Sequence, residues 1–245
     1  MADSYLVRDF SGTPTNADKF TFSAWVKRSN LGGPHYILTN RNAAGTDFAY
    51  VCFDSSNRLE ITDQQSSSNV LNLITTRVFR DTTSWYHIMI VGDSTQGTDT
   101  NRLKLYINGS QVTKFDTATW ISQNTDFNFA KETSGTSSGW GIGSRPDGSG
   151  FFEGNMTHIN MVDGTACATS VFGSADSTTG EWKPILAPSV TYGNEGFFLK
   201  FEDSSALGTD SSGNGNNWTV NGSLKQSIST PSNNFATYDL NQSNN

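Results

Sequence analysis

The stretch from Lys19 to Arg28, KFTFSAWVKR, alternates apolar and polar residues with a period of two. One face would carry Phe20, Phe22, Ala24 and Val26, and the other Thr21, Ser23, Trp25 and Lys27. Successive side chains of a β-strand point to opposite faces, so this pattern predicts a strand with one buried face. No segment keeps apolar residues at helical spacing for three turns behind a capping residue. The chain is therefore expected to be all-β.

Further short strands are predicted between clusters of Gly, Asn and Ser. They are HYILTNR, FAYVCFD, RLEITD, SWYHIMIVGD, RLKLYINGSQV, GWGIGS, NMTHINMV, GFFLKFED and NWTVNG. In RLKLYINGSQV, the pair Asn108-Gly109 is typical of a two-residue hairpin turn, because both residues tolerate positive φ. Many short strands at near-regular spacing favour a β-sandwich or barrel.

The charge and the distribution of apolar residues disfavour nucleic acid and membrane as partners. The 245 residues carry a formal net charge of −7, which disfavours binding to phosphate backbones, so no nucleic acid is expected. No apolar run approaches the roughly 20 residues of a membrane helix, so no membrane is expected. The start, MADSYLVRDF, lacks the basic and apolar regions of a secretory signal. A function outside a cell would then need another exit route, such as release inside a virus particle.

The cysteines and histidines show no metal-binding spacing. Cys52, within FAYVCF, is interpreted as a small buried hydrophobe, and whether it pairs with Cys167 stays open. His87 lies in an apolar strand and is interpreted as a hydrogen-bonded structural residue rather than a catalytic one.

The order of these segments resembles the laminin-G-like, concanavalin-A-like jelly roll. The resemblance is carried by FTFSAWVKR, by SWYHIMIV followed by LKLYINGSQV, and by GIGS and FFEGNMTHINMVDG. It implies an antiparallel β-sandwich, which we place over residues 1–222. Residues 223–245 lose the apolar alternation and are expected to form an extended C-terminal arm or linker. The stretch from Ala166 to Gly193 is expected to be an ordered loop lying over the sandwich.

Other segments resemble jelly-roll domains in structural proteins of tailed phages, especially marine ones. These segments are DGTA, TGEWKP, YGNEGFFLKFEDSSALGTDSSGNGNNWT and TPSNNFAT. The resemblance implies a virion structural protein, made in the host cytoplasm and displayed in multiple copies as a capsid decoration, fibre or tail component. Its partners would be other virion proteins and host surface polysaccharide. The alternative is a carbohydrate-binding module or lectin.

The same fold hosts glycoside hydrolases, which need two carboxyl groups about 5–10 Å apart. The resemblance to glucanases implies acidic residues at alternating positions of one strand, and no strand here has them. Glu60 and Asp63 in RLEITD are three positions apart and therefore should face opposite ways. A hydrolase remains a third hypothesis, but we expect a protein without catalytic residues.

Candidate binding residues are aromatic rings and oxygen ligands in loops. Trp25, Trp140 and Trp218 are candidates for stacking on a sugar ring, although tryptophans of a sandwich are commonly core residues. Asp210, Ser212 and Asn214 with Gly215 match the start of a calcium loop, but Asn221 stands where an EF-hand has glutamate.

Two interpretations of this loop remain. The loop is either a turn capped by Asp210 and Asn214, or part of a Ca²⁺ site to which Asp203 would contribute. Calcium is the one cofactor under consideration.

Overall fold

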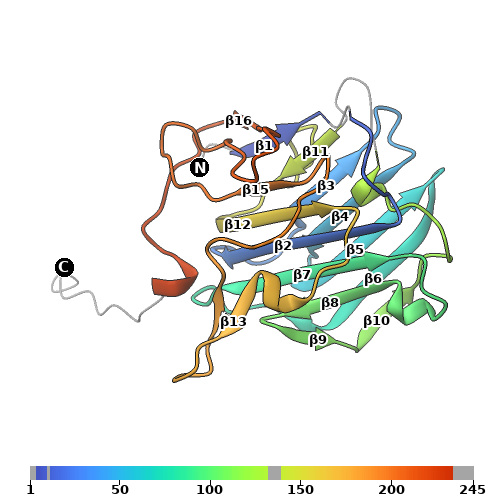
Figure 1. Cartoon of the computed structure of the whole chain (residues 1–245), viewed down its shortest axis with the longest axis horizontal. Helices are drawn as coiled ribbons and strands as arrows, with labels where there is room; N and C mark the ends of the chain where they lie inside the picture. The colour runs from blue at the N-terminus through green and yellow to red at the C-terminus, as the bar shows by residue number, and fades with distance from the viewer. Residues whose placement is uncertain (1–3, 10–11, 132–138, 234–245) are drawn as a thin grey trace, which may run out of the picture.

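The computed structural model describes residues 4–9, 12–131 and 139–233, and their regular structure is almost entirely antiparallel β-sheet. One sheet has eight strands in the order β10-β6-β5-β4-β3-β11-β1-β16, and the other has six in the order β15-β12-β2-β7-β8-β9. The two sheets lie one behind the other in Figure 1. This arrangement confirms the predicted β-sandwich.

The strand bounds are as follows. The eight-stranded sheet comprises β10 (Phe115–Thr119), β6 (Ser68–Val78), β5 (Arg58–Gln65), β4 (Phe48–Phe53), β3 (His35–Arg41), β11 (Gly139–Ile142), β1 (Tyr5–Arg8) and β16 (Thr219–Asn221). The six-stranded sheet comprises β15 (Phe197–Leu199), β12 (Gly154–Asp163), β2 (Lys19–Arg28), β7 (Tyr86–Asp93), β8 (Leu103–Ile107) and β9 (Ser110–Val112). Single 3-10 turns occur at η1 (Asp99–Asn101), η2 (Asn128–Ala130), η3 (Thr169–Val171) and η4 (Pro231–Asn233).

The core lies between the two sheets and follows the predicted alternation. Strand β2 contributes Phe20, Phe22, Ala24 and Val26, all fully buried. The facing sheet contributes one aligned row of Leu38, Val51, Ile61 and Leu73 from neighbouring strands. Each Phe, Val, Leu or Ile side chain among them contributes about 1.5–3 kcal/mol through removal from water. Burial of one strand face against another thus fixes the register of both sheets.

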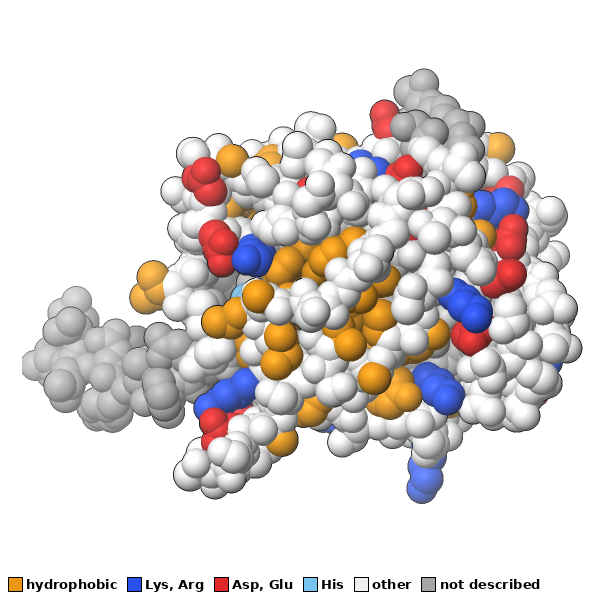
Figure 2. Space-filling view, in the orientation of Figure 1, with side chains coloured by type: hydrophobic (Ala, Val, Ile, Leu, Met, Phe, Trp, Pro, Cys, Tyr) orange, Lys and Arg blue, Asp and Glu red, His pale blue; other side chains and the backbone are white. Residues whose placement is uncertain are grey.

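The other face of β2 is also buried, because residues 166–193 cross over it. This segment includes η3 and the two-stranded sheet of β13 (Gly173–Ala175) and β14 (Trp182–Pro184). It forms a second apolar cluster with the sheet, made of Met89, Val162, Phe172, Tyr192 and Phe198. Figure 2 shows hydrophobic side chains gathered in the middle of this face. The predicted ordered loop over the sandwich is confirmed, with two short strands added.

Local geometry agrees with the hairpin prediction and shortens one predicted strand. Asn108 and Gly109 both adopt positive φ (49° and 77°) between paired residues Ile107 and Ser110. The strand predicted over GFFLKFED stops after Leu199, and Phe201 has a φ of 61°, outside the range of extended strand residues.

Three further features concern the remaining sequence predictions. Strand β6 was not predicted, because Ser, Asn and Thr dilute its alternation, although its Leu71 and Leu73 reach the core. Cys52 and Cys167 are both free, and Cys52 is buried as expected. No helix within the described ranges is long and apolar enough to cross a membrane.

The C-terminal boundary remains a prediction. Strand β16 ends at Asn221, and residues 222–230 form no strand before the single 3-10 turn η4. Gln226 attaches this part of the predicted arm to the body by donating hydrogen bonds to the carbonyls of Phe201 and Glu202. Residues 234–245 of the predicted arm lie outside the described residues.

Candidate functional site

The three tryptophans predicted to bind sugar are all buried, with relative exposures of 3% for Trp25, 1% for Trp140 and 5% for Trp218. Trp140 and Trp218 pack edge-to-face with each other and with Phe197, so their rings belong to the main core. A sugar can stack only on an exposed ring face. We therefore correct the sequence-based assignment: these tryptophans have a packing role in this fold.

Trp25 is covered by the segment that crosses its sheet. Its ring stacks on His87, with centroids 4.9 Å apart, and His87 in turn stacks on Trp182 of β14. The indole N–H of Trp182 donates to His87 Nδ1 at 2.9 Å. That bond makes Nδ1 an acceptor, so Nε2 carries the proton and donates to Ser23 Oγ at 2.8 Å. Burial lowers the pKa of His87 to about 3, which keeps the ring neutral.

His87 therefore holds the crossing segment on the sheet, as predicted for a structural histidine. Its backbone N–H donates to Asn108 Oδ1, which links the same site to the hairpin turn. A Cβ on Gly109 would lie 2.7 Å from Cζ3 of Trp182, so the turn and the indole ring are closely packed.

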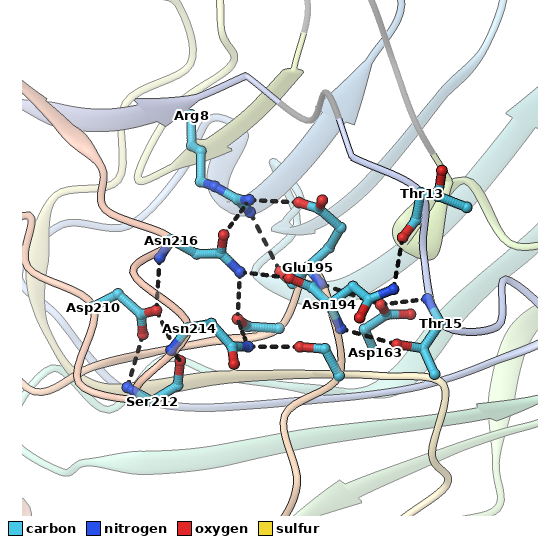
Figure 3. Close-up of polar contacts among 12 residues, drawn as sticks. Arg8, Thr13, Thr15, Asp163, Asn194, Glu195, Asp210, Ser212, Asn214 and Asn216 are labelled. Atoms are coloured by element: carbon cyan, nitrogen blue, oxygen red, sulfur yellow. Dashed lines mark hydrogen bonds and ion pairs between the residues drawn. The ribbon is translucent and has the colours of Figure 1, made fainter.

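The loop from Asp210 to Asn217 is a turn built around one carboxylate (Figure 3). Asp210 is 8% exposed and accepts four hydrogen bonds: from the backbone N–H groups of Phe198, Ser212 and Asn216, and from the hydroxyl of Ser212. Gly213 and Gly215 adopt positive φ as expected for the turn. Donors from the chain thus occupy the oxygens that a cation would need.

The other predicted metal ligands, Asn214 and Asp203, also make hydrogen bonds within the chain. The amide of Asn214 donates to the carbonyls of Gly193 and Gly196, and Asp203 accepts bonds from Ser205 in an exposed turn of its own. Asp203 and Asp210 do not meet in a cluster: no group of three His, Cys, Asp or Glu residues able to hold a metal occurs in the described part of the chain. The geometry favours the turn interpretation over the calcium interpretation.

Figure 3 also shows that this turn belongs to a larger polar network. Asn216 bridges to Arg8 of β1, and Arg8 forms an ion pair with Glu195. The backbone N–H of Glu195 donates to Asp163 at the end of β12, which also accepts from the N–H of Thr15. Four segments far apart in the sequence are therefore joined, and the role of this network is structural.

A different group of residues forms a candidate site on the outer face of the eight-stranded sheet. Strand pairing aligns Tyr36, Cys52 and Glu60 in one row and Thr39, Tyr50 and Thr62 in the next. None of these side chains belongs to the two apolar clusters, whereas their strand neighbours Leu38, Val51 and Ile61 are core residues. Period-two alternation along β4 and β5 therefore places the two rows on the face that points away from the core. In β3 the register shifts between Tyr36 and Leu38, and this irregularity brings Tyr36 to the same face as Thr39.

This face carries a cavity of 200 Å³. Its wall includes Tyr36, Arg41, Phe48, Tyr50, Arg145 and Asp147. The rings of Phe48 and Tyr50 are stacked, with centroids 5.7 Å apart, and Tyr36 meets Tyr50 edge-to-face at 5.4 Å. Phe48 and Tyr50 are half-buried and so retain exposed ring surface. Aromatic surface beside hydrogen-bonding side chains is the chemistry that suits a sugar, whose C–H face is apolar and whose edge is polar.

The polar groups around the cavity are held by one another. Arg41 pairs with Asp147 at 2.9 Å, and Arg145 lies over the Tyr36 ring with its guanidinium carbon 4.7 Å from the centroid. The hydroxyl of Tyr50 donates to Glu60 at 2.8 Å. Burial raises the pKa of both Tyr36 and Tyr50 above the ordinary value, so both hydroxyls stay protonated at neutral pH.

The carboxylates at this site are engaged by neighbouring hydrogen-bond donors. Glu60 is the one acidic residue that β3 to β6 turn to this face, and it accepts hydrogen bonds from Tyr50 and Thr62. Asp63 faces the core instead, as its position three residues from Glu60 predicted. Asp147 is engaged by Arg41 and by Ser149. Neither outward carboxylate is presented as a free acid or base.

The sequence analysis missed this aromatic group because Tyr36 comes from β3 and the other two rings from β4. A signal was nevertheless present: Phe48 and Tyr50 stand two positions apart in FAYVCFD and must share a strand face. The contribution of Arg145 had no sequence signal, since that residue lies in a loop 109 positions from Tyr36.

A second cavity, of 280 Å³, lies at the end of the sandwich. Its wall includes Trp85, His158 and Phe201 together with residues 224–227, which belong to the predicted arm. His158 and Phe201 both adopt positive φ (48° and 61°). Since Gln226 anchors the arm to this wall, we interpret the cavity as the place where the arm crosses the sandwich.

Several solved structures are similar to this chain. A candidate carbohydrate-binding protein of Bacteroides ovatus aligns over 89% of this chain with a TM-score of 0.58 and 16% identity, and the chain spans 56% of that protein's length. A carbohydrate-binding module of Bacillus subtilis aligns over 64% of this chain and 78% of its own length, at 10% identity and a TM-score of 0.34. The enzymatically active domain of tailspike protein 2 from bacteriophage CBA120 aligns over 69% of this chain and 25% of its own, at 11% identity and a TM-score of 0.43.

No curated protein sequence matches the chain. The sequence profile of the concanavalin A-like lectin/glucanases superfamily matches residues 3–171, more than half of the chain. This span contains β1 to β12 and thus most of both sheets, including every residue of the aromatic cavity. The chain therefore belongs to the concanavalin A-like lectin/glucanases superfamily.

Proposed function

We propose that this chain is a non-catalytic carbohydrate-binding domain whose site is the cavity lined by Tyr36, Phe48 and Tyr50. The observation that carries the proposal is the half-buried aromatic pair Phe48 and Tyr50, set beside guanidinium and carboxylate groups on an otherwise regular sheet. The Bacteroides ovatus protein of similar fold, described as a candidate carbohydrate binder, supports the class of ligand. Its low identity supports nothing about a particular sugar.

The test is a glycan microarray followed by calorimetry, comparing wild type with Tyr50→Ala. The substitution removes half of the ring stack. Stacking of a nucleic-acid base on an aromatic side chain is worth about 1–3 kcal/mol, and a contribution of about 1 kcal/mol from a sugar ring would weaken binding about fivefold. Tyr50→Phe should keep most of the affinity, because the ring remains and the loss is confined to the hydroxyl, which donates to Glu60.

Tyr106→Ala is the matched control. Tyr106 is also a half-buried tyrosine, but it packs on the opposite sheet against the crossing segment. If Tyr50→Ala binds glycans as well as wild type does, or if wild type binds none at high concentration, the proposal is wrong. Release of reducing ends from laminarin or agar would contradict the non-catalytic part.

We further propose that the domain is displayed on the particle of a tailed phage, as a capsid decoration, fibre or tail component. Support comes from the resemblance of two segments, TGEWKP and YGNEGFFLKFEDSSALGTDSSGNGNNWT, to structural proteins of tailed phages. Both segments lie beyond the residues matched by the superfamily profile. In the structure these motifs contribute to the segment that crosses the six-stranded sheet and to the network in Figure 3. The two proposals are compatible, since a displayed domain can contact host polysaccharide.

Mass spectrometry of purified particles tests this second proposal. Hundreds of copies per particle would indicate a decoration protein, and a handful would indicate a tail component. Presence in infected-cell lysate but absence from purified particles would contradict it.

A further inference from the structure

The cation at the edge of the aromatic cavity indicates which sugars the site selects. We propose that the site prefers glycans carrying an anionic group, a carboxylate or a sulfate, and that Arg145 binds that group. This inference rests on the proposed function, because it names the class of ligand for the same cavity.

The first observation is the difference in pairing between the two arginines of the cavity wall. Arg41 is neutralised by Asp147, at 2.9 Å. Arg145 contacts the ring and the hydroxyl of Tyr36, both uncharged, and no carboxylate in the described ranges lies within ion-pair distance of it. A guanidinium has five N–H donors in a planar fork, so most of its donors remain for a ligand.

The second observation is that the nearby carboxylates do not compete for Arg145. Glu60 accepts hydrogen bonds from Tyr50 and Thr62, and Asp147 accepts from Arg41 and Ser149. Among the described residues, Arg145 is thus a cation of the cavity wall without an ion-pair partner, although the chain as a whole carries a net charge of −7. An anion entering the cavity would meet Arg145 without first breaking an ion pair.

The third observation is that the backbone around Arg145 is fixed before any ligand binds. The N–H of Arg145 donates to Ser149 O, and its carbonyl accepts from Gly148 N, which closes a tight turn. That turn is attached to β3 at both ends, through Tyr36 N to Gly150 O and through Thr39 Oγ1 to Ser144 O. Tyr36 then positions the guanidinium at the edge of the ring stack. Such preorganisation lowers the entropic cost of binding.

The cavity would bind two parts of one ligand at two different places. The C–H face of a sugar ring would lie on Phe48 and Tyr50, while an acidic substituent on the same or the next ring would reach Arg145. Guanidinium is well suited to carboxylate and sulfate because two of its N–H groups can bind two oxygens at once.

The experiment uses matched ligand pairs that differ only in charge. One pair is oligogalacturonate and its methyl ester, and the other is a sulfated galactan oligosaccharide and its desulfated form. Calorimetry with wild type should show one charged ligand binding about tenfold more tightly than its neutral partner, as expected for a charge-assisted hydrogen bond. The preference should shrink as salt is raised, because the contact is near the surface.

Arg145→Ala should reduce the ratio of charged to neutral affinity to about one, and Arg145→Lys should restore part of it. Arg145 is exposed, so both variants should fold, and circular dichroism would verify this. Arg80→Ala is the control: it removes an equally exposed positive charge outside the cavity wall and should leave the ratio unchanged.

The outcomes separate the two proposals. If charged and neutral members bind equally to wild type, the anion preference is wrong and the carbohydrate-binding function stands. A charge preference that survives in Arg145→Ala also overturns the assignment. If neither member of either pair binds, and the microarray shows no other ligand, the proposed function itself fails and the inference falls with it.

Discussion

Asp63 should make the stability of this fold decrease as the pH rises from about 4 to about 7. Its side chain is 0% exposed and faces the core between Ala49 and Leu71 of the neighbouring strands. One strong partner, the backbone N–H of Asn128, donates to it at 2.7 Å. Burial raises the pKa of the carboxyl from 3.8 to about 7, against the opposing effect of that hydrogen bond.

The sign and size follow from proton linkage. The unfolded chain releases the Asp63 proton near pH 3.8, whereas the folded protein keeps it to about pH 7. Between these values the folded state binds more protons, so the free energy of unfolding falls as pH rises, and above about pH 7 this contribution is flat. At about 1.36 kcal/mol per pKa unit, the loss across the window is roughly 4 kcal/mol.

The assay is urea unfolding of wild type and Asp63→Asn at a series of pH values from 4 to 9. The variant cannot titrate at this position, so the difference in free energy of unfolding, variant minus wild type, should rise by several kcal/mol over the window. Any fixed cost of burying the amide group shifts that difference equally at every pH. Asp126→Asn, which changes an exposed carboxylate on the adjoining loop, is the control. A pH-independent difference for Asp63→Asn would refute the reasoning.

Three further predictions concern the crossing segment, the hairpin and the polar turn. Trp182→Phe should lower the free energy of unfolding by about 1–3 kcal/mol in urea titrations, because it leaves the buried Nδ1 of His87 without its donor. An unchanged free energy of unfolding would contradict the role of this hydrogen bond in holding the crossing segment on the sheet. Gly109→Ala should lower the melting temperature, because it adds a Cβ at a φ of 77° and 2.7 Å from Trp182. Gly97→Ala is the control and should have little effect, since no atom lies within 4 Å of its added Cβ. Equal effects of the two substitutions on the melting temperature would argue against this packing. A chelator should leave the melting temperature unchanged, whereas Asp210→Ala should lower it, because the carboxylate accepts hydrogen bonds from the backbone N–H groups of Phe198 and Asn216. A drop in melting temperature on adding chelator would favour a bound ion instead.

The fold could be predicted closely from the sequence because its strongest signals are local. Alternation along β2 identifies the buried residues Phe20, Phe22, Ala24 and Val26, and Asn108-Gly109 fixes a hairpin by backbone conformation alone. The absence of alternating carboxylates on any strand is also local, which is why Asp63 and Glu60 could be placed on opposite faces in advance.

The sites could not be predicted in the same way, because they depend on what covers each sheet face. Trp25 has polar strand neighbours, which fits either a groove-lining ring or a ring covered by a loop, and the segment carrying Trp182 lies over it. The reverse holds for Tyr36, which joins Arg145 at a cavity only because a loop 109 residues away in the sequence packs beside β3. A strand pattern states which residues share a face, whereas long-range packing decides whether that face is core, covered or open to a ligand. For this chain the sequence therefore determined most of the strands and their inner faces, and the tertiary structure decided which outer faces are covered and which carry a cavity.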